Sequence, residues 1–168
     1  MLIDKTEISK HREISKAVKD SKINPFIEDA ELLDLKPLLG NKMYFDLVAN
    51  KTEANYVKLL DGGSFDVGEI EYSFVGLKKI LSIFVDARYK LFGSATDTPF
   101  GLVEKSNQDS QPVSIATKKD IYTKNRQIAY QYFSDVKLFL DNNKTDYPLW
   151  KTDCKQRVTG GFRISKIS

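Results

Sequence analysis

Residues 74–92, FVGLKKILSIFVDARYKLF, make up the most apolar window of the chain. Five charged residues interrupt this window, which is too many for a membrane span of roughly 20 residues. Its apolar residues recur at intervals of three, four or seven, as on one face of an α-helix. We therefore expect a buried helix at the centre of the fold, with Arg88 on its apolar face beside Leu77, Ile80, Leu81, Phe84 and Leu91. The opposite face is expected to be a polar stripe of Lys79, Ser82, Asp86 and Lys90.

A second long helix is predicted over residues 114–143. Its apolar positions also recur in steps of three, four or seven, and further apolar residues widen the stripe beyond a coiled-coil seam. At ~1.5 Å per residue the helix would be about 40 Å long. Its apolar face is expected to contain Ile115, Tyr122, Ala129, Phe133, Val136 and Leu140.

The chain before the central helix contains recognisable helix boundaries. Asn24 is a typical helix N-cap, because its side-chain oxygen accepts a bond from an otherwise unpaired backbone N–H. Pro25 suits the first helical position, which needs no N–H donor. We expect this helix to end or kink near Lys36, because Pro37 disfavours helical backbone at the residue before it.

Smaller elements follow. Short helices are expected over 42–49 and 54–60, and Gly62 is a typical residue just after a helix. Alternating apolar residues over 63–72 predict one small β-hairpin. The fold class is therefore mainly α, a single helical domain over 1–168 with a long C-terminal helix and one small β-hairpin.

Three segments have weaker patterns. Residues 1–20 are mixed in charge and are expected to form an N-terminal arm or a short helix. Residues 94–113 are rich in Ser, Thr, Asn, Asp, Gly and Pro, and they are expected to form a projecting loop, long for a compact domain. Residues 145–168 are expected to form a basic tail, broken by Pro148 and a Gly-Gly pair.

Composition excludes several kinds of chemistry. The 26 basic and 23 acidic residues give a net charge of +3, too mild to require a nucleic acid or membrane partner. His11 is the only histidine and Cys154 the only cysteine, so one chain cannot build an all-His/Cys zinc site or an intrachain disulfide. No secretory signal pattern follows the basic N-terminal residues. We expect a soluble protein made in a reducing compartment.

Charge is unevenly distributed along the chain. Residues 25–76 contain ten acidic and four basic residues, a net charge of −6. Residues 114–168 contain eleven basic and five acidic residues, a net charge of +6. The two parts can neutralise each other within one fold, or they can form complementary patches between neighbouring copies, as in a head-to-tail ring.

Candidate catalytic residues are few. His11 is interpreted as a surface histidine and Cys154 as an incidental residue of the tail. Glu28, Glu31 and Asp34 lie three apart, a spacing that could present a metal-binding face but is more typical of a solvated one. Arg88 is expected to pair with a buried carboxylate or carbonyl for structural reasons.

Four stretches together resemble a known family: 22–40 (KINPFIEDAELLDLKPLLG), 60–63 (LDGG), 96–101 (TDTPFG) and 146–150 (DYPLW). In this order and spacing they resemble virion proteins of tailed phages and prophages, the head-to-tail connector or adaptor proteins. The resemblance spans roughly residues 8–150.

The resemblance implies a structural protein of the virion neck, made in the cytoplasm of the bacterial host. Copies would form a ring, commonly twelve-fold, between the portal protein and a neck or tail protein. Double-stranded DNA would pass through the lumen without specific binding. No enzyme activity, catalytic residue, cofactor, metal or membrane is expected. The suspected partner contacts are Thr98, Pro99, Phe100, Tyr147, Trp150, Arg157 and Arg163.

Two other classes of function stay open. A nucleic-acid-binding accessory protein would use the basic C-terminal part, and its affinity would fall steeply with salt. A small enzyme or enzyme regulator would use the Glu28, Glu31 and Asp34 face with a divalent ion, which would raise thermal stability.

Overall fold

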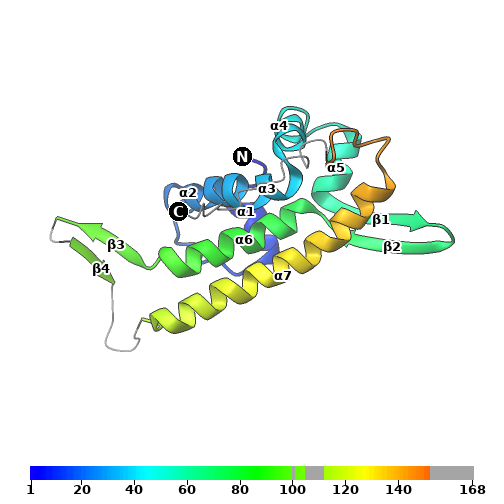
Figure 1. The fold of residues 1–168 in the computed structure, drawn as a ribbon. Coiled ribbons are helices and arrows are strands. Elements are labelled where there is room, and N and C mark those ends of the chain that lie inside the picture. The colour runs from blue at the N-terminus through cyan, green and yellow to red at the C-terminus, as the bar shows by residue number, and fades with distance from the viewer. Residues whose placement is uncertain (100, 105–111, 152–168) are drawn as a thin grey trace, which may run out of the picture.

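The computed structural model describes residues 1–99, 101–104 and 112–151. Two long antiparallel helices lie side by side along the molecule, α6 (Leu77–Phe92) and α7 (Ile115–Asn142) (Figure 1). The shorter helical segments come first in the chain: α1 (Lys5–His11), α2 (Asp20–Ala30), the π-helix η1 (Glu31–Leu35), α3 (Lys36–Leu39), α4 (Asn41–Ala49) and α5 (Ala54–Asp61). The strands are β1 (Gly62–Val67), β2 (Ile70–Val75), β3 (Ala95–Thr98) and β4 (Gly101–Glu104). The mainly helical class with a long C-terminal helix is confirmed.

Helix α6 is buried on nearly all sides, because α1, α2, α5 and α7 all pack against it. The expected polar stripe is therefore wrong at Ser82 and Asp86, which are fully buried, whereas Lys79 is half-buried and Lys90 is exposed. The Ser82 hydroxyl donates to the Lys78 carbonyl oxygen over 2.7 Å, and Asp86 accepts from the Asn125 amide of α7 over 2.9 Å. The Ser82 hydroxyl and the Oδ2 atom of Asp86 are thus hydrogen-bonded inside the fold, while the buried Oδ1 of Asp86 has no hydrogen-bond partner among the described residues. Within the part of the chain that is described, no helix has the length and hydropathy needed to cross a membrane.

Helix α2 begins at Asp20, so the predicted start at Asn24 is wrong. Pro25 lies inside the helix on its exposed side. It removes one backbone hydrogen bond there. Ile23 and Ile27, four residues apart on the opposite side, are both fully buried. Their packing keeps the first turn helical and outweighs the local preference of Pro25 for a helix start.

Pro37 was predicted to end or kink the helix near Lys36; the helix does not end there, but its α-helical pattern changes to a π-helical turn directly before Lys36. The chain stays helical through η1 and α3 as far as Gly40, whose positive φ of 82° closes it. The π-helical turn comes directly before Pro37, and such turns relax the four-residue hydrogen-bond ladder that a proline ring would disrupt. Leu35 and Leu39, on either side of the proline, are both buried.

The N-terminal residues are part of the core: the predicted short helix is present as α1, and the alternative of an arm is wrong. Leu2, Ile3, Ile8 and Ile14 are all buried, and α1 packs against α6. The Leu2 backbone N–H donates to a buried Glu31 carboxylate oxygen over 2.5 Å. One hydrophobic core therefore includes residues from the start of the chain to Tyr147.

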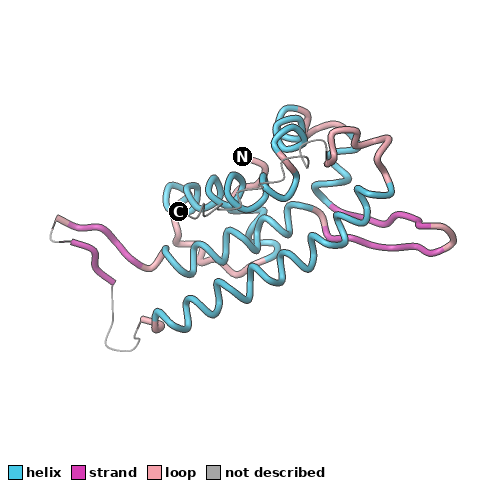
Figure 2. Tube along the Cα trace, viewed as in Figure 1, coloured by secondary structure: helices cyan, strands magenta, loops and turns pink. Residues whose placement is uncertain are grey.

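The predicted β-hairpin is confirmed as β1–β2, with a two-residue turn at Gly68 and Glu69. The segment expected to be a projecting loop, 94–113, contains a second antiparallel hairpin, β3–β4. Figure 2 shows the two hairpins extending from opposite ends of the helical body. Alternating hydrophobicity identified the first hairpin, whereas the second has mostly polar residues and turn formers.

Two glycines let the backbone cross tightly where α5, β1, β2 and α6 meet. Gly62 has φ of 88° and pairs with Val75, and a Cβ at Gly62 would overlap the Gly76 nitrogen. A Cβ at Gly76 would overlap the Leu60 carbonyl oxygen. This crossing holds the base of the β1–β2 hairpin against the start of α6.

We predict that Gly76→Ala lowers the free energy of unfolding by more than about 2 kcal/mol, because backbone atoms have to move. Gly68→Ala serves as the matched change, since only its positive φ of 63° is strained and no atom lies within 4 Å of the added Cβ. Its expected cost is about 1 kcal/mol. Urea denaturation followed by circular dichroism measures both. Equal losses of unfolding free energy in the two variants would contradict a tight backbone crossing at Gly76.

Candidate interaction surfaces

A buried ionic cluster ties three helical elements together. Asp34 of η1 is 2 % exposed. One of its carboxylate oxygens accepts from the Arg88 Nε of α6 over 2.6 Å, and the other accepts from Arg126 of α7. Asp34 is thus the carboxylate partner expected for Arg88. It also neutralises one cation of the basic C-terminal part within the same chain.

Aromatic rings surround the outer arginine of this cluster. The Arg126 guanidinium carbon lies 5.3–5.6 Å from the ring centroids of Phe84, Tyr122 and Tyr130. Arg126 also donates to the Tyr130 hydroxyl over 2.7 Å. The Asp34 carboxylate and the three ring faces together fix the position of the guanidinium, so these contacts stabilise the fold.

The acidic residues 28, 31 and 34 do not form a common metal-binding face. Glu31 points inward and accepts from the Leu2 N–H and the Tyr44 hydroxyl, while Asp34 binds two arginines and Glu28 is exposed. In the described residues, no three His, Cys, Asp or Glu side chains are placed to share a metal ion. The spacing of three fails as a guide here because η1 is a π-helix.

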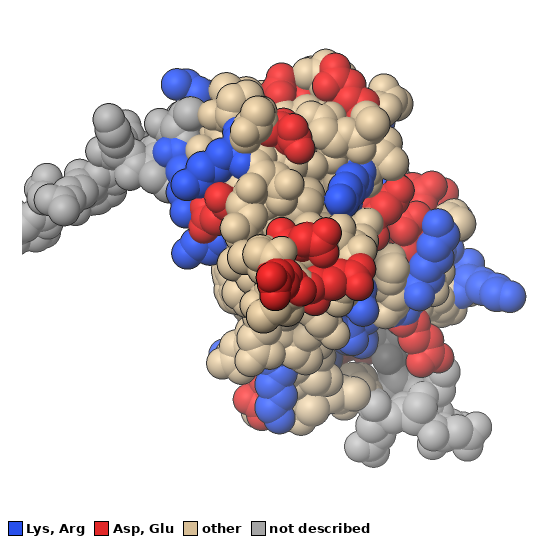
Figure 3. All heavy atoms as spheres, turned by 90° about the vertical axis from the view of Figure 1, so that its right-hand side faces the viewer, with Lys and Arg blue, Asp and Glu red and all other residues tan. Residues whose placement is uncertain are grey.

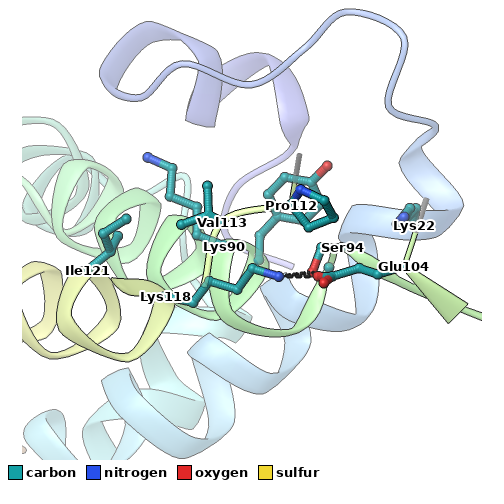
Figure 4. A pocket seen from close by; sticks show the side chains of 10 residues that line it. Lys22, Lys90, Ser94, Glu104, Pro112, Val113, Lys118 and Ile121 are labelled. Carbon is teal, nitrogen blue, oxygen red and sulfur yellow. Dashed lines mark hydrogen bonds and ion pairs between the residues drawn. The ribbon is translucent and has the colours of Figure 1, made fainter. Parts of the chain in front are cut away.

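A first candidate surface lies at the end of the molecule that carries β3–β4. Lys118 of α7 forms an ion pair with Glu104 of β4 and donates to the Ser94 hydroxyl over 2.8 Å (Figure 4). These bonds from Lys118 and Ser94 hold the pKa of the Glu104 carboxyl below its usual value. They anchor the base of the hairpin to the first turns of α7. A hollow of about 600 Å³ beside them is lined in part by Lys22 and Lys90.

An adjoining apolar groove of about 580 Å³ is open to solvent. Phe92, Val103 and Ile115 line it and are 57 %, 42 % and 61 % exposed. Ile115 was expected on the core-facing side of the long helix, and that expectation is wrong. The first turns of α7 extend past the core, and its buried face begins at Lys118. Hydrophobic periodicity cannot distinguish a residue facing the core from one facing such a groove.

A second candidate surface is the tip of the β1–β2 hairpin. Ile70 is 60 % exposed and Tyr72 is 38 % exposed, although both lie on the apolar face of the hairpin. Asp66, Glu69 and Glu71 make the tip acidic. Figure 3 looks onto this end of the molecule, and acidic side chains gather on it.

The structure separates the suspected partner contacts into three groups. Thr98 and Pro99 lie at the β3–β4 turn, where Pro99 is exposed and the Thr98 hydroxyl donates to the Gly101 carbonyl oxygen over 2.7 Å. Phe100, Arg157 and Arg163 lie outside the described residues, as does Cys154. Tyr147 and Trp150 form the third group.

Tyr147 and Trp150 pack against the protein's own core. Tyr147 is buried, so its assignment as a partner contact is wrong, whereas Trp150 is only half-buried and its assignment stays a prediction. Tyr147 is 3 % exposed, and its hydroxyl donates to the Asn55 carbonyl oxygen over 2.6 Å. The Trp150 indole donates to Asp141 over 2.8 Å. The turn after α7 brings these residues back over the helical body, so the first part of the predicted basic tail, as far as Trp150, is docked.

His11, interpreted from the sequence as a surface histidine, is half-buried at the end of α1. Its Nε2 lies 3.4 Å from a Glu7 carboxylate oxygen, one turn earlier. Lys10 forms an ion pair with the same carboxylate over 2.7 Å. The three side chains form a local surface network.

Comparison with known proteins places the chain in a family. Residues 35–160 match the model of DUF6712, described as a family of unknown function. This match covers most of the chain, which therefore belongs to the DUF6712 family. No curated protein matches the chain. No solved structure matches it either.

We predict that Asp34→Ala lowers the free energy of unfolding by roughly 3–5 kcal/mol, because it leaves two guanidinium groups close together without their counter-charge. Asp29→Ala, on an exposed side of the neighbouring helix, is the control and should change stability by less than about 0.5 kcal/mol. Chemical denaturation of both variants measures the difference. A loss under about 1 kcal/mol at Asp34 would contradict its role as the anchor of three elements.

A pH dependence is expected from Tyr147. Burial raises its pKa to about 12, with a further contribution from the charge of Asp146. In the unfolded chain a tyrosine ionises near pH 10. The unfolded state therefore loses this proton first, so stability is fully present below about pH 10 and falls as the pH rises toward about 12.

Tyr147→Phe tests this, because phenylalanine cannot ionise. The variant should lose roughly 1 kcal/mol near neutral pH, where the hydroxyl bond to Asn55 is missing. Its free energy of unfolding should then decline less steeply than that of the parent protein above about pH 10. Urea denaturation at a series of alkaline pH values measures both slopes. Identical slopes would exclude a raised pKa at this residue.

Proposed function

We propose that this protein is a structural, non-enzymatic subunit of a head-to-tail connector ring in the neck of a tailed phage or prophage. Its copies associate through one repeating contact into a ring between the portal protein and the next neck or tail component. DNA passes through the lumen. The resemblance of residues 22–40, 60–63, 96–101 and 146–150 to that class of protein supplies the expectation.

The observation that carries the proposal is the pair of hairpins at opposite ends of the helical body (Figure 2). One end presents an acidic tip with exposed apolar side chains, and the other presents an apolar groove beside lysines. Two different surfaces on one chain suit a heterologous contact, which repeats from copy to copy and forms a ring when its rotation closes.

The β3–β4 turn is the natural contact for a component outside the ring. It projects furthest from the helical body at its end of the molecule (Figure 1), and its residues Thr98 and Pro99 add little to the core. Its base is fixed by the Lys118–Glu104 ion pair, so the hairpin can be held in place while its turn contacts a portal protein.

Part of the basic charge of the C-terminal half is already bound by carboxylates of the same chain, which weakens the alternative of a nucleic-acid-binding accessory protein. Arg126 is bound by Asp34, Lys118 by Glu104, and Lys151, just beyond the helix, by Asp141. Phosphate binding would have to compete with these carboxylates. A connector whose lumen must let DNA slide needs little phosphate affinity.

We expect the purified protein, alone or with the portal protein of the same genome, to form one discrete ring. Light scattering across a range of concentrations should give a mass that is a whole multiple of the 19.2 kDa subunit, twelve-fold if the resemblance holds to that level. Electron microscopy should show closed rings. A chain that stays monomeric in both conditions, yet binds duplex DNA with a steep loss of affinity in salt, would replace the connector by the accessory-protein function.

A further inference from the structure

We propose that the tip of the β1–β2 hairpin of one copy docks into the apolar groove beside the β3–β4 hairpin of the next copy. The groove is lined by Phe92, Val103 and Ile115. The inference rests on the proposed ring assembly and identifies the two surfaces that form its repeating contact.

The apolar face of β1–β2 continues past the end of the core. At its base, Phe65 and Phe74 pack against Phe139 of α7, with ring centroids 5.3 Å and 4.3 Å from the Phe139 centroid. Phe65 is paired across the hairpin with Tyr72, and the next pair on the same face, Val67 and Ile70, lies nearer the turn.

Burial changes along this face. Phe65 and Phe74 are 7 % and 5 % exposed, whereas Tyr72 is 38 % and Ile70 is 60 % exposed. A two-stranded hairpin is only marginally stable unless its apolar face packs against something. The chain provides that packing at the base alone, so the tip presents an apolar face without cover among the described residues.

The groove offers a matching surface at the other end of the molecule. Phe92 ends α6, Val103 lies on β4 and Ile115 starts α7, so three elements contribute one exposed apolar side chain each. Leu91 and Ala95 complete the apolar part of its lining.

Charge distinguishes this contact from a nonspecific apolar one. Strands β1 and β2 with their turn contain three acidic residues and no basic residue: Asp66, Glu69 and Glu71. In the groove itself Lys118 and Glu104 neutralise each other, and the adjoining hollow adds Lys22 and Lys90. Lys90 is paired with the buried Asp86 over 3.0 Å, so Lys22 is the cation of this lining with no carboxylate bound to it among the described ion pairs. An acidic tip approaching this surface gains favourable electrostatic interaction and a defined orientation.

Because the tip and the groove lie at opposite ends of the molecule, the contact joins different copies and is heterologous. The tip cannot reach the groove of its own chain, because the lengths of α6 and α7 separate them (Figure 1). Each copy therefore donates one tip and accepts another, and the contact repeats in one direction.

Disulfide trapping tests the contact even if it is transient in the isolated protein. In a Cys154→Ser background, Ile70→Cys and Ile115→Cys are combined in one chain, and the protein is oxidised with copper–phenanthroline. Non-reducing gels should show a ladder of covalent oligomers in steps of 19.2 kDa. A mixture of the two single-cysteine chains should stop at a heterodimer, because each chain then carries only one reactive surface.

The matched control replaces Ile70→Cys with Leu33→Cys, keeping Ile115→Cys. Leu33 is 59 % exposed and Ile70 is 60 % exposed, so the two thiols are equally accessible. The tip pair should cross-link at least about tenfold faster than the control pair. Its rate should also fall as salt screens the acidic tip from the lysines. Circular dichroism of each variant checks that the helical fold is retained.

The outcomes separate this inference from the proposed function. Equal trapping by the tip pair and the control pair would overturn the docking contact. If the parent protein nevertheless forms a discrete ring, the connector function stands and its interface lies elsewhere. If the parent protein forms no ring with its portal protein and the tip pair also fails, both proposals are overturned.

Discussion

The buried carboxylate of Asp34 is the interaction on which the arrangement of the helices depends. It binds Arg88 of α6 and Arg126 of α7 at once, so one side chain connects the π-helical turn η1 to both long helices. Moving charges out of water is costly unless their partners are well placed. Here the two arginines share one carboxylate, and Phe84, Tyr122 and Tyr130 cover the outer guanidinium. The cost is thereby offset within a polar seam that specifies how η1, α6 and α7 meet.

The long axis of the molecule follows from the same helical pair. The β3–β4 hairpin lies in the connection between the antiparallel helices α6 and α7, at one end of the pair, and β1–β2, which directly precedes α6, lies at the other end (Figure 1). The Gly62 and Gly76 crossing holds one hairpin to the start of α6, while the Lys118–Glu104 ion pair holds the other to the start of α7. The two ends consequently differ in charge and in shape, which is the property that a repeating contact between identical copies requires.

Sequence periodicity predicted the parts of the fold whose signals are local. The two long helices, the glycine after α5 and the β1–β2 hairpin follow from spacing and turn chemistry. The predictions that failed are those in which tertiary packing outweighs the local preference of a residue. Pro25 and Pro37 are accommodated because buried neighbours hold the helix, and Ser82 and Asp86 are buried because α6 is enclosed. For the candidate surfaces, the sequence predicted a projecting segment over 94–113 but not the β3–β4 hairpin that it contains. It could not reveal that Tyr147 docks internally or that Ile115 lines a groove, because both depend on which elements meet in space.

The turn at Gly68 and Glu69 gives this architecture room for evolutionary change. Nothing lies within 4 Å of a Cβ added at Gly68, and the turn stands clear of the helical body (Figure 2). Exposed turns of this kind tolerate inserted residues well. Residues gained or lost there in pairs would lengthen or shorten the arm and keep the strand register, so relatives could differ in reach and preferred neighbour while sharing an unchanged core.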